Sequence, residues 1–174
     1  MNPRWEVSEA TWLGSFSKLE HPAIAYVVLD LGSSGPRPWL DAARDSVELI
    51  GRVNGVANPA ELERAFELDL DFLCLVGDQG EVDPKRLPLR LLVEEPVDQA
   101  LEHLALLGAA WARRIRGWEG ADPERLAELA RRERIFLTAT AAMPDPGIVA
   151  AIAPFAVTLP EGASAADLAA WNST

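Results

Sequence analysis

Apolar residues gather in seven short runs along the chain, and polar residues bound each run. The runs cover residues 24–30, 47–53, 72–77, 89–94, 111–116, 135–140 and 155–159. Their starts lie about 17 to 25 residues apart. Several runs are nearly continuous in apolar residues, which is typical of parallel strands covered on both faces. The pattern therefore predicts seven strands of a parallel sheet.

Short stretches with helix-start signals lie between these runs. Three of them begin with Asn or Asp before a proline at the first helical position, namely Asn58-Pro59, Asp122-Pro123 and Asp145-Pro146. Ser164 and Asp167 have the spacing of a capping box, and Asp98 is placed to cap a further helix. Strands that alternate with short helices indicate repeated βα units.

The regular repetition of these units predicts a compact TIM-type (β/α) barrel of seven or eight parallel strands. We expect a single α/β domain over residues 1–174. The alternative is a doubly wound open parallel sheet, which commonly has fewer and less uniform units. Residues 1–20 show no clear pattern, and the stretch 11–19 is either an eighth strand or an arm over the barrel mouth.

Composition narrows the range of partners. The net charge of −11 argues against nucleic acid and anionic membrane, because both would repel the chain. One cysteine and two histidines exclude a Cys-based zinc cluster and a multi-histidine metal site. Apolar runs are too short for a membrane span, and the first residues lack the apolar stretch of a secretory signal, so we expect a cytoplasmic protein.

The polar residues that follow the predicted strands are the candidates for chemistry, because active sites of βα barrels lie at the C-terminal strand ends. These residues are Asp30, Asn54, Asp78, Glu94, Glu95, Arg116, Thr138, Thr140, Thr158 and Glu161. Carboxylates crowded at one mouth raise one another's pKa for acid–base work. We therefore expect Asp30, Asp78 and Glu94 to act as acid or base. We expect no cofactor, although such carboxylates could also hold a divalent cation such as magnesium.

The run ARRIRGW supplies a candidate for binding an anion. Alternation along a strand places Arg114 and Arg116 on one face and Arg113 on the other. At a barrel mouth, Arg116 could clamp a carboxylate or phosphate in a bidentate fashion. Alternatively, these arginines pair with surface acids. Asn54, Thr138 and Thr140 complete the predicted substrate-binding set.

Two further residue types have less direct interpretations. Cys74 lies in the middle of an apolar run, which predicts a buried and inert thiol. The six tryptophans are many for this length, and we expect them to pack the core, cover a barrel end, stack on a flat ligand or form an oligomer surface.

The segment RVNGVANPAELERAFELDLDFLCLVG, residues 52–77, resembles the opening of phosphoribosylanthranilate isomerase. Gly55, Pro59 and Asp71 stand at the spacing of that family. Gly117 matches a later turn, and the C-terminal stretch from Phe136 resembles the last two βα units. The resemblance implies a βα barrel and an isomerase whose substrate carries a phosphate.

Several positions depart from the family's pattern. Asn54 stands at the position of the catalytic cysteine, so that family's general base is absent. Arg116 replaces a histidine. At the position of the family's last phosphate-binding turn, Pro160 lacks an N–H donor and Glu161 adds a negative charge.

Two functions therefore remain open. The first is a small-molecule-binding barrel, an isomerase or lyase acting on a small phosphorylated or carboxylated metabolite. The second is a non-catalytic barrel that serves as a binding or assembly subunit, with surface tryptophans as contacts. The first is favoured because a barrel mouth is a ready pocket. The predicted partner is a small molecule, and self-association into a homo-oligomer stays open.

Overall fold

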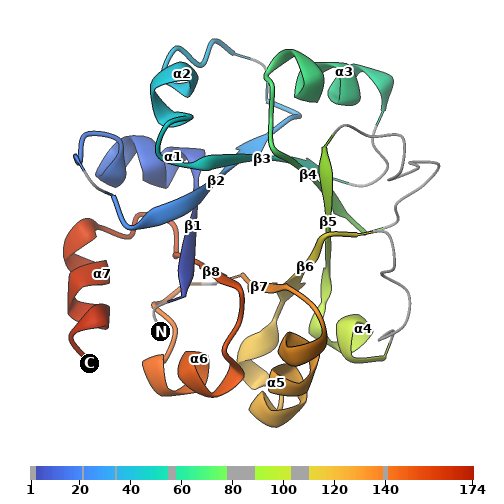
Figure 1. The fold of residues 1–174 in the computed structure, drawn as a ribbon, viewed down its shortest axis with the longest axis vertical. Helices are drawn as coiled ribbons and strands as arrows, with labels where there is room; N and C mark the ends of the chain where they lie inside the picture. The colour runs from blue at the N-terminus through green and yellow to red at the C-terminus, as the bar shows by residue number, and fades with distance from the viewer. Residues whose placement is uncertain are drawn as a thin grey trace.

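The computed structural model describes residues 3–20, 22–33, 35–54, 58–77, 89–102, 110–138 and 141–174. Eight parallel strands form a closed barrel in chain order, and the last strand pairs with the first. Figure 1 looks into the barrel and shows the helices around its outside. The predicted TIM-type barrel is confirmed, and the alternative of an open sheet is excluded.

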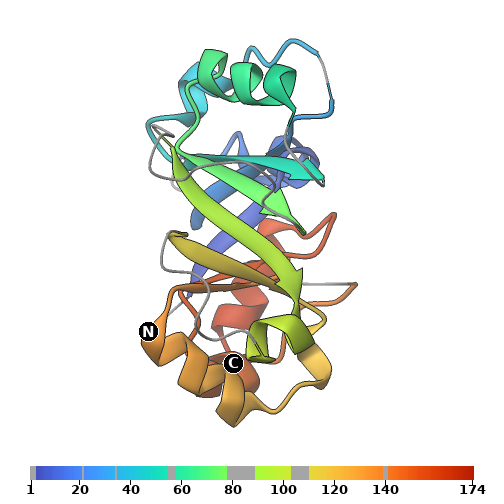
Figure 2. The same cartoon turned by 90° about the vertical axis from the view of Figure 1, so that its right-hand side faces the viewer.

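The strands are β1 (Arg4–Ser8), β2 (Ile24–Asp30), β3 (Glu48–Asn54), β4 (Phe72–Val76), β5 (Arg90–Pro96), β6 (Ala112–Arg116), β7 (Ile135–Leu137) and β8 (Ala156–Thr158). The helices are α1 (Glu9–Thr11), η1 (Trp12–Phe16), α2 (Leu40–Ala43), α3 (Pro59–Glu67), α4 (Val97–Glu102), η3 (Trp118–Gly120), α5 (Pro123–Arg132), α6 (Pro146–Ile152) and α7 (Ala165–Asn172). Figure 2 shows the barrel from the side, with α3 above the strands and α5 below them in this view, both outside the barrel wall. The seven predicted runs correspond to β2 through β8.

The eighth strand precedes the stretch in which we expected it. β1 spans Arg4–Ser8, whereas residues 11–19 are largely helical. The side chain of Ser8 accepts a hydrogen bond of 3.2 Å from the backbone N–H of Thr11, which starts α1 directly after the strand. The N-terminal segment therefore supplies a strand of the barrel wall rather than an arm over its mouth.

Local capping signals set the starts of four helices. The side chains of Asn58, Asp122, Asp145 and Ser164 accept hydrogen bonds from backbone N–H groups in the first turns of α3, α5, α6 and α7. The prediction that Asp98 is a cap is wrong, because α4 begins at Val97, directly after β5 ends at Pro96. Asp98 therefore lies inside the first turn of α4.

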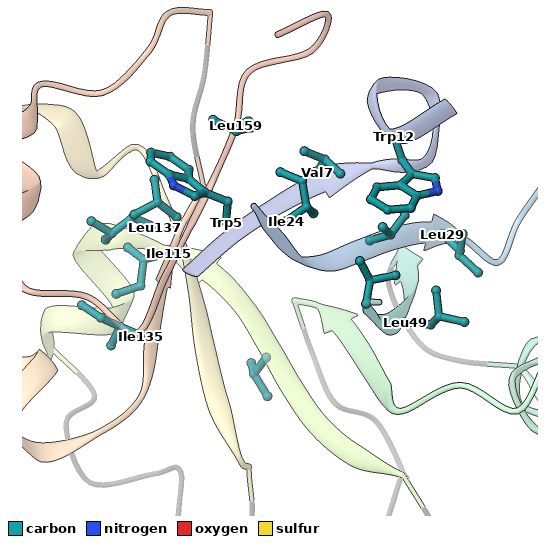
Figure 3. Close-up of a cluster of buried hydrophobic side chains, with 14 of the residues drawn as sticks. Trp5, Val7, Trp12, Ile24, Leu29, Leu49, Ile115, Ile135, Leu137 and Leu159 are labelled. Atoms are coloured by element: carbon teal, nitrogen blue, oxygen red, sulfur yellow. The ribbon is translucent and has the colours of Figure 1, made fainter. Parts of the chain in front are cut away.

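Apolar side chains pack in two regions. Outward-facing residues such as Trp5, Val7 and Leu49 pack against the helices, and Figure 3 shows part of this cluster. The backbone of Gly51 passes close to the helical layer, because a Cβ there would lie 2.6 Å from Leu70 Cδ1.

Inside the barrel, aromatic rings fill the end at which the strands start. The rings belong to Tyr26, Phe72, Trp111, Phe136 and Phe155. Guanidinium groups stack on them from the end of the barrel: those of Arg4 over Phe155, Arg90 over Phe72 and Arg134 over Trp111, at 4.2, 4.2 and 4.6 Å from the ring centroids. The aromatic rings do not extend to the opposite end of the barrel, where a cavity lies at the carboxyl ends of the strands.

Candidate functional site

A cavity of about 520 Å³ lies at the carboxyl ends of the strands. Its acidic lining residues are Glu6, Asp30, Glu94 and Glu161. Its basic lining residues are Arg52, Arg114 and Arg116. Hydroxyl groups come from Ser8, Thr138 and Thr158. Active sites of this fold lie at the same end of the barrel.

Strand alternation explains why these charges face the interior. Ile50, Leu92 and Ala112 pack inside the barrel on β3, β5 and β6. The residues two positions further along point to the same side, one layer nearer the mouth. These residues are Arg52, Glu94 and Arg114. On each of these three strands, an inward-facing apolar residue therefore lies beneath an inward-facing charged residue.

Arg114 is the centre of the charged layer. Its guanidinium is almost fully buried and donates to Oε1 of Glu6 through one nitrogen and to Oε1 of Glu94 through the other. Thr158 donates a further hydrogen bond of 2.7 Å to the same oxygen of Glu6. Burial opposes the charge of Arg114, but Glu6, Cys74 and Glu94 outweigh it and raise its pKa. Arg114 is therefore a permanent cation that joins strands on opposite parts of the wall.

Glu94 connects Arg114 to the open part of the cavity. Arg52 donates to it twice, from Nε to Oε1 at 3.2 Å and from Nη2 to Oε2 at 2.7 Å. Nε of Arg116 lies 3.5 Å from Oε2. Burial favours the neutral acid, but the hydrogen bond from Arg52 and the three nearby guanidinium charges outweigh it and lower the pKa of Glu94.

A carboxylate held in its ionised form is a weak general acid at neutral pH. The environment of Glu94 thus fits a group that positions guanidiniums better than one that transfers protons. Its expected role as acid or base remains a prediction, and this geometry does not favour it.

Asp30 and Arg116 lie at the rim of the same cavity. The Asp30 carboxylate is exposed, and its Oδ1 accepts a 2.9 Å hydrogen bond from the backbone N–H of Gly32, which fixes its orientation. The Arg116 side chain is 47% exposed, so part of its guanidinium is open to a ligand. Asp30, Glu94 and Arg116 therefore share one cavity, while Asp78 lies outside the described residues.

The other predicted binding residues are placed less favourably. Thr138 lines the cavity, but its hydroxyl donates to the carbonyl of Ile115 at 2.9 Å. Asn54 is exposed at the end of β3 and is not among the described residues that line the cavity. Thr140 lies outside the described part of the chain. The roles of these three residues remain predictions.

Sequence reasoning missed Glu6 and Arg52 and did not assign a role to Arg114. A signal for Glu6 was present in RWEVS, where apolar Trp5 and Val7 alternate with polar residues. Such alternation indicates a strand with one polar face. Arg113, in contrast, lies on the other face of β6 from Arg114, as predicted, and forms ion pairs with Glu95 at 3.0 Å and Glu133 at 2.8 Å.

The predicted burial of Cys74 is confirmed. Cys74 is fully buried, and its burial raises the pKa of the thiol to about 12. Within the described ranges, no three His, Cys, Asp or Glu residues are grouped so as to hold a metal ion. None of the helices in these ranges is long and apolar enough to cross a membrane.

Comparison with known proteins adds information on the fold. No family model and no curated protein matches the chain. Solved structures do match it. The neighbours are mostly phosphoribosylanthranilate isomerases. The enzyme from Thermococcus kodakaraensis matches with a TM-score of 0.66 and 11% identity, over 99% of this chain and 98% of that chain.

Two further neighbours show how broadly the fold is shared. TrpF from Jonesia denitrificans matches with a TM-score of 0.60 and 17% identity, over 92% of this chain and 87% of that one. An HpcH/HpaI aldolase from Desulfitobacterium hafniense matches with a TM-score of 0.62 and 10% identity, over 99% and 90%. At these identities the likeness shows the fold alone. The segment 52–77 forms the end of β3, α3 and β4 in this barrel.

Proposed function

We propose that this protein binds a small anionic metabolite at the barrel mouth and acts on it as an isomerase or lyase. The observation that carries the proposal is the pair Arg52 and Arg116, whose side chains are 31% and 47% exposed where they line the cavity. Glu94 contacts both of them and fixes their guanidiniums. A fixed guanidinium presents paired N–H donors that match the oxygens of a carboxylate or phosphate.

The charge balance of this group supports anion binding. Within the ion-pair network, Glu6 and Glu94 supply two negative charges and Arg52, Arg114 and Arg116 supply three positive ones, which leaves one positive charge in excess. The carboxylates of Asp30 and Glu161 line the same cavity outside this network and bring the whole lining to four negative and three positive charges. Arg114 is buried and occupied by Glu6 and Glu94. The excess charge therefore lies with Arg52 and Arg116, the two members that a ligand can reach.

Asp30 is the group best placed to move a proton in this proposal. It is exposed to the cavity, oriented by Gly32 and free of the ion pairs that hold Glu94 in its charged form. Isomerases and lyases both need a positioned acid or base next to the reacting carbon. The neighbours that share the fold include isomerases and an aldolase, so the scaffold accommodates both classes.

The alternative of an assembly subunit with surface tryptophans has less support. Trp5, Trp12 and Trp118 are buried, and Trp39, Trp111 and Trp171 are half-buried. Among the described residues, the exposed large apolar side chains are few, and Phe66 on α3 and Ile148 on α6 lie on separate elements. Formation of a homo-oligomer stays a prediction.

A thermal-shift screen tests the proposal. The unaltered protein and the Arg116→Gln variant are each melted without ligand and with inorganic phosphate, ribose 5-phosphate or short 2-oxo acids. A ligand at about 100 times its Kd stabilises the folded state by roughly 2.7 kcal/mol, which raises the Tm of a chain this size by roughly 5 to 10 °C. We expect such a shift with at least one anion and its loss in Arg116→Gln.

The matched control is Arg132→Gln, because Arg132 is exposed on α5 and pairs with Glu128 outside the barrel. The control variant should keep the full shift. If no anion raises the Tm, or if Arg116→Gln shows the same shift as the control, the proposal is wrong.

A further inference from the structure

The charged groups of the cavity divide between two sides of the mouth. β8, β1 and β2 are neighbours in the closed sheet, and they or the loops after them carry Glu161, Glu6 and Asp30. β3 to β6 form the facing arc, which carries Arg52, Glu94 and Arg116. Figure 1 shows these two arcs on either side of the barrel axis. The cavity is therefore acidic along one arc and has its accessible cations along the other.

The acidic arc holds a buried carboxylate that lacks part of its hydrogen bonding. Glu6 lines the cavity and is 0% exposed. Its Oε1 accepts from Arg114 and Thr158, whereas its Oε2 accepts nothing from the described part of the chain. Buried carboxylate oxygens nearly always have a donor. An occupant of the cavity with N–H or O–H groups on this side would supply the donor that this oxygen lacks among the described residues.

The two rim carboxylates of the same arc also carry free charge. The Asp30 carboxylate accepts from the N–H of Gly32, and Glu161 accepts a 3.1 Å hydrogen bond from the hydroxyl of Thr11. Arg37 donates to the backbone carbonyl of Asp30 at 3.1 Å, but its charge is paired with Glu9. Within the described residues neither carboxylate forms an ion pair of its own, and both line the cavity. They and Glu6 form no group that could hold a metal ion. An ammonium group fits this arc better, because its three N–H donors can bond carboxylates one at a time without the close ligand cluster that a metal ion needs.

The position of Glu161 also decides where an anion binds. Barrels of this type frequently bind phosphate at the loops after the seventh and eighth strands. Here Glu161 occupies the loop after β8, and its charge repels an anion at that place. An anionic group is thereby directed to Arg52 and Arg116 on the facing arc.

From this division we infer that the ligand is a zwitterion, with its anionic group at Arg52 and Arg116 and an ammonium group at Asp30 and Glu161. The inference rests on the proposed function and adds the second charge to its substrate class. The ligand spans the mouth from β6 to β2, and its ammonium group brings donors to the side of the cavity where Glu6 lies.

Calorimetric titration with ω-amino acids tests this. The probes are β-alanine, 4-aminobutanoate and 5-aminopentanoate, which separate the same two charges by increasing lengths. Butanoate and butylamine each carry one of the charges. A hydrogen bond to a charged group contributes about tenfold or more in affinity. We expect one ω-amino acid to bind at least about tenfold more tightly than both butanoate and butylamine.

A double substitution then tests where the ammonium end of the probe binds. In the double variant Asp30→Asn, Glu161→Gln, the preferred ω-amino acid should bind no better than butanoate. The matched control, Glu128→Gln on the outside of α5, should keep the preference. If butanoate binds the unaltered protein as tightly as every ω-amino acid, the inference is wrong while the proposed function stands. If no carboxylate, phosphate or ω-amino acid binds, both are wrong.

Discussion

Arg114 is the residue on which the charged layer depends. It is buried, and it contacts two buried carboxylates, of which Glu6 has only Thr158 as a further partner among the described residues. Pairing offsets the cost of removing these charges from water, so loss of one member leaves the others buried without compensation. The layer thus creates a rigid and polar cavity floor, and its stability requires all of its members.

Arg114→Met should lower the free energy of unfolding by about 3 to 5 kcal/mol, because Glu6 and part of Glu94 then lack a countercharge. Urea unfolding of the purified variant measures the change. Arg132→Met, which removes an exposed arginine on α5, should cost less than about 1 kcal/mol. Equal stability of the two variants would show that the buried network does not hold the barrel together.

The lowered pKa of Glu94 makes part of the stability depend on pH. Because its pKa in the folded state lies below the ordinary value of 4.5, the stabilisation is complete above that value and is lost as the pH falls through the folded pKa. Glu94→Gln should therefore be less stable than the unaltered protein at pH 7, and the gap should narrow below pH 4.5. Urea midpoints between pH 7 and pH 3 measure this. A gap that stays constant over this range would contradict the assignment.

Cys74 offers a probe of the interior. Burial raises the pKa of its thiol to about 12, and the thiolate is the reactive form. We expect no reaction with a thiol-specific disulfide reagent at pH 8 in the folded protein and one equivalent after unfolding in urea. Rapid labelling of the folded protein would show that the inner layer opens to solvent.

At the scale of elements, helix starts could be predicted from the sequence where the cap contacts residues close to it in the chain. Asn58, Asp122, Asp145 and Ser164 cap helices through contacts within three residues, so the local sequence was sufficient. The prediction that Asp98 caps a helix was wrong, because the chain passes from β5 into α4 with no residue between them for a separate cap.

This contrast predicts different costs for two similar substitutions. Asp122→Ala removes the side chain that accepts the hydrogen bond of Glu124 N–H at 3.0 Å and should lower the free energy of unfolding by about 1 kcal/mol. Asp98→Ala should cost less than about 0.5 kcal/mol, because Asp98 lies inside the first turn of α4. Thermal or urea unfolding of both variants provides the comparison, and a larger cost at Asp98 would reverse the assignment of caps.

At the scale of the whole molecule, repetition in the sequence predicted the barrel but not its first strand. β1 escaped detection because its inward face carries Arg4, Glu6 and Ser8, so no apolar run marks it. The residues of the cavity were likewise only partly predictable from the sequence. Asp30, Glu94 and Arg116 follow from strand ends, whereas the pairing of Glu6 with Arg114 joins residues 108 positions apart. Only closure of the sheet brings β1 near β6.

In the proposed function, accessible guanidiniums at the mouth bind the anionic group of a small ligand. The most direct test is the calorimetric Kd of the anion that gives the largest thermal shift, measured on the unaltered protein and on Arg116→Gln. We predict that the Kd rises at least about tenfold in Arg116→Gln and stays unchanged in Arg132→Gln. An equal Kd for Arg116→Gln and the unaltered protein would contradict the claim.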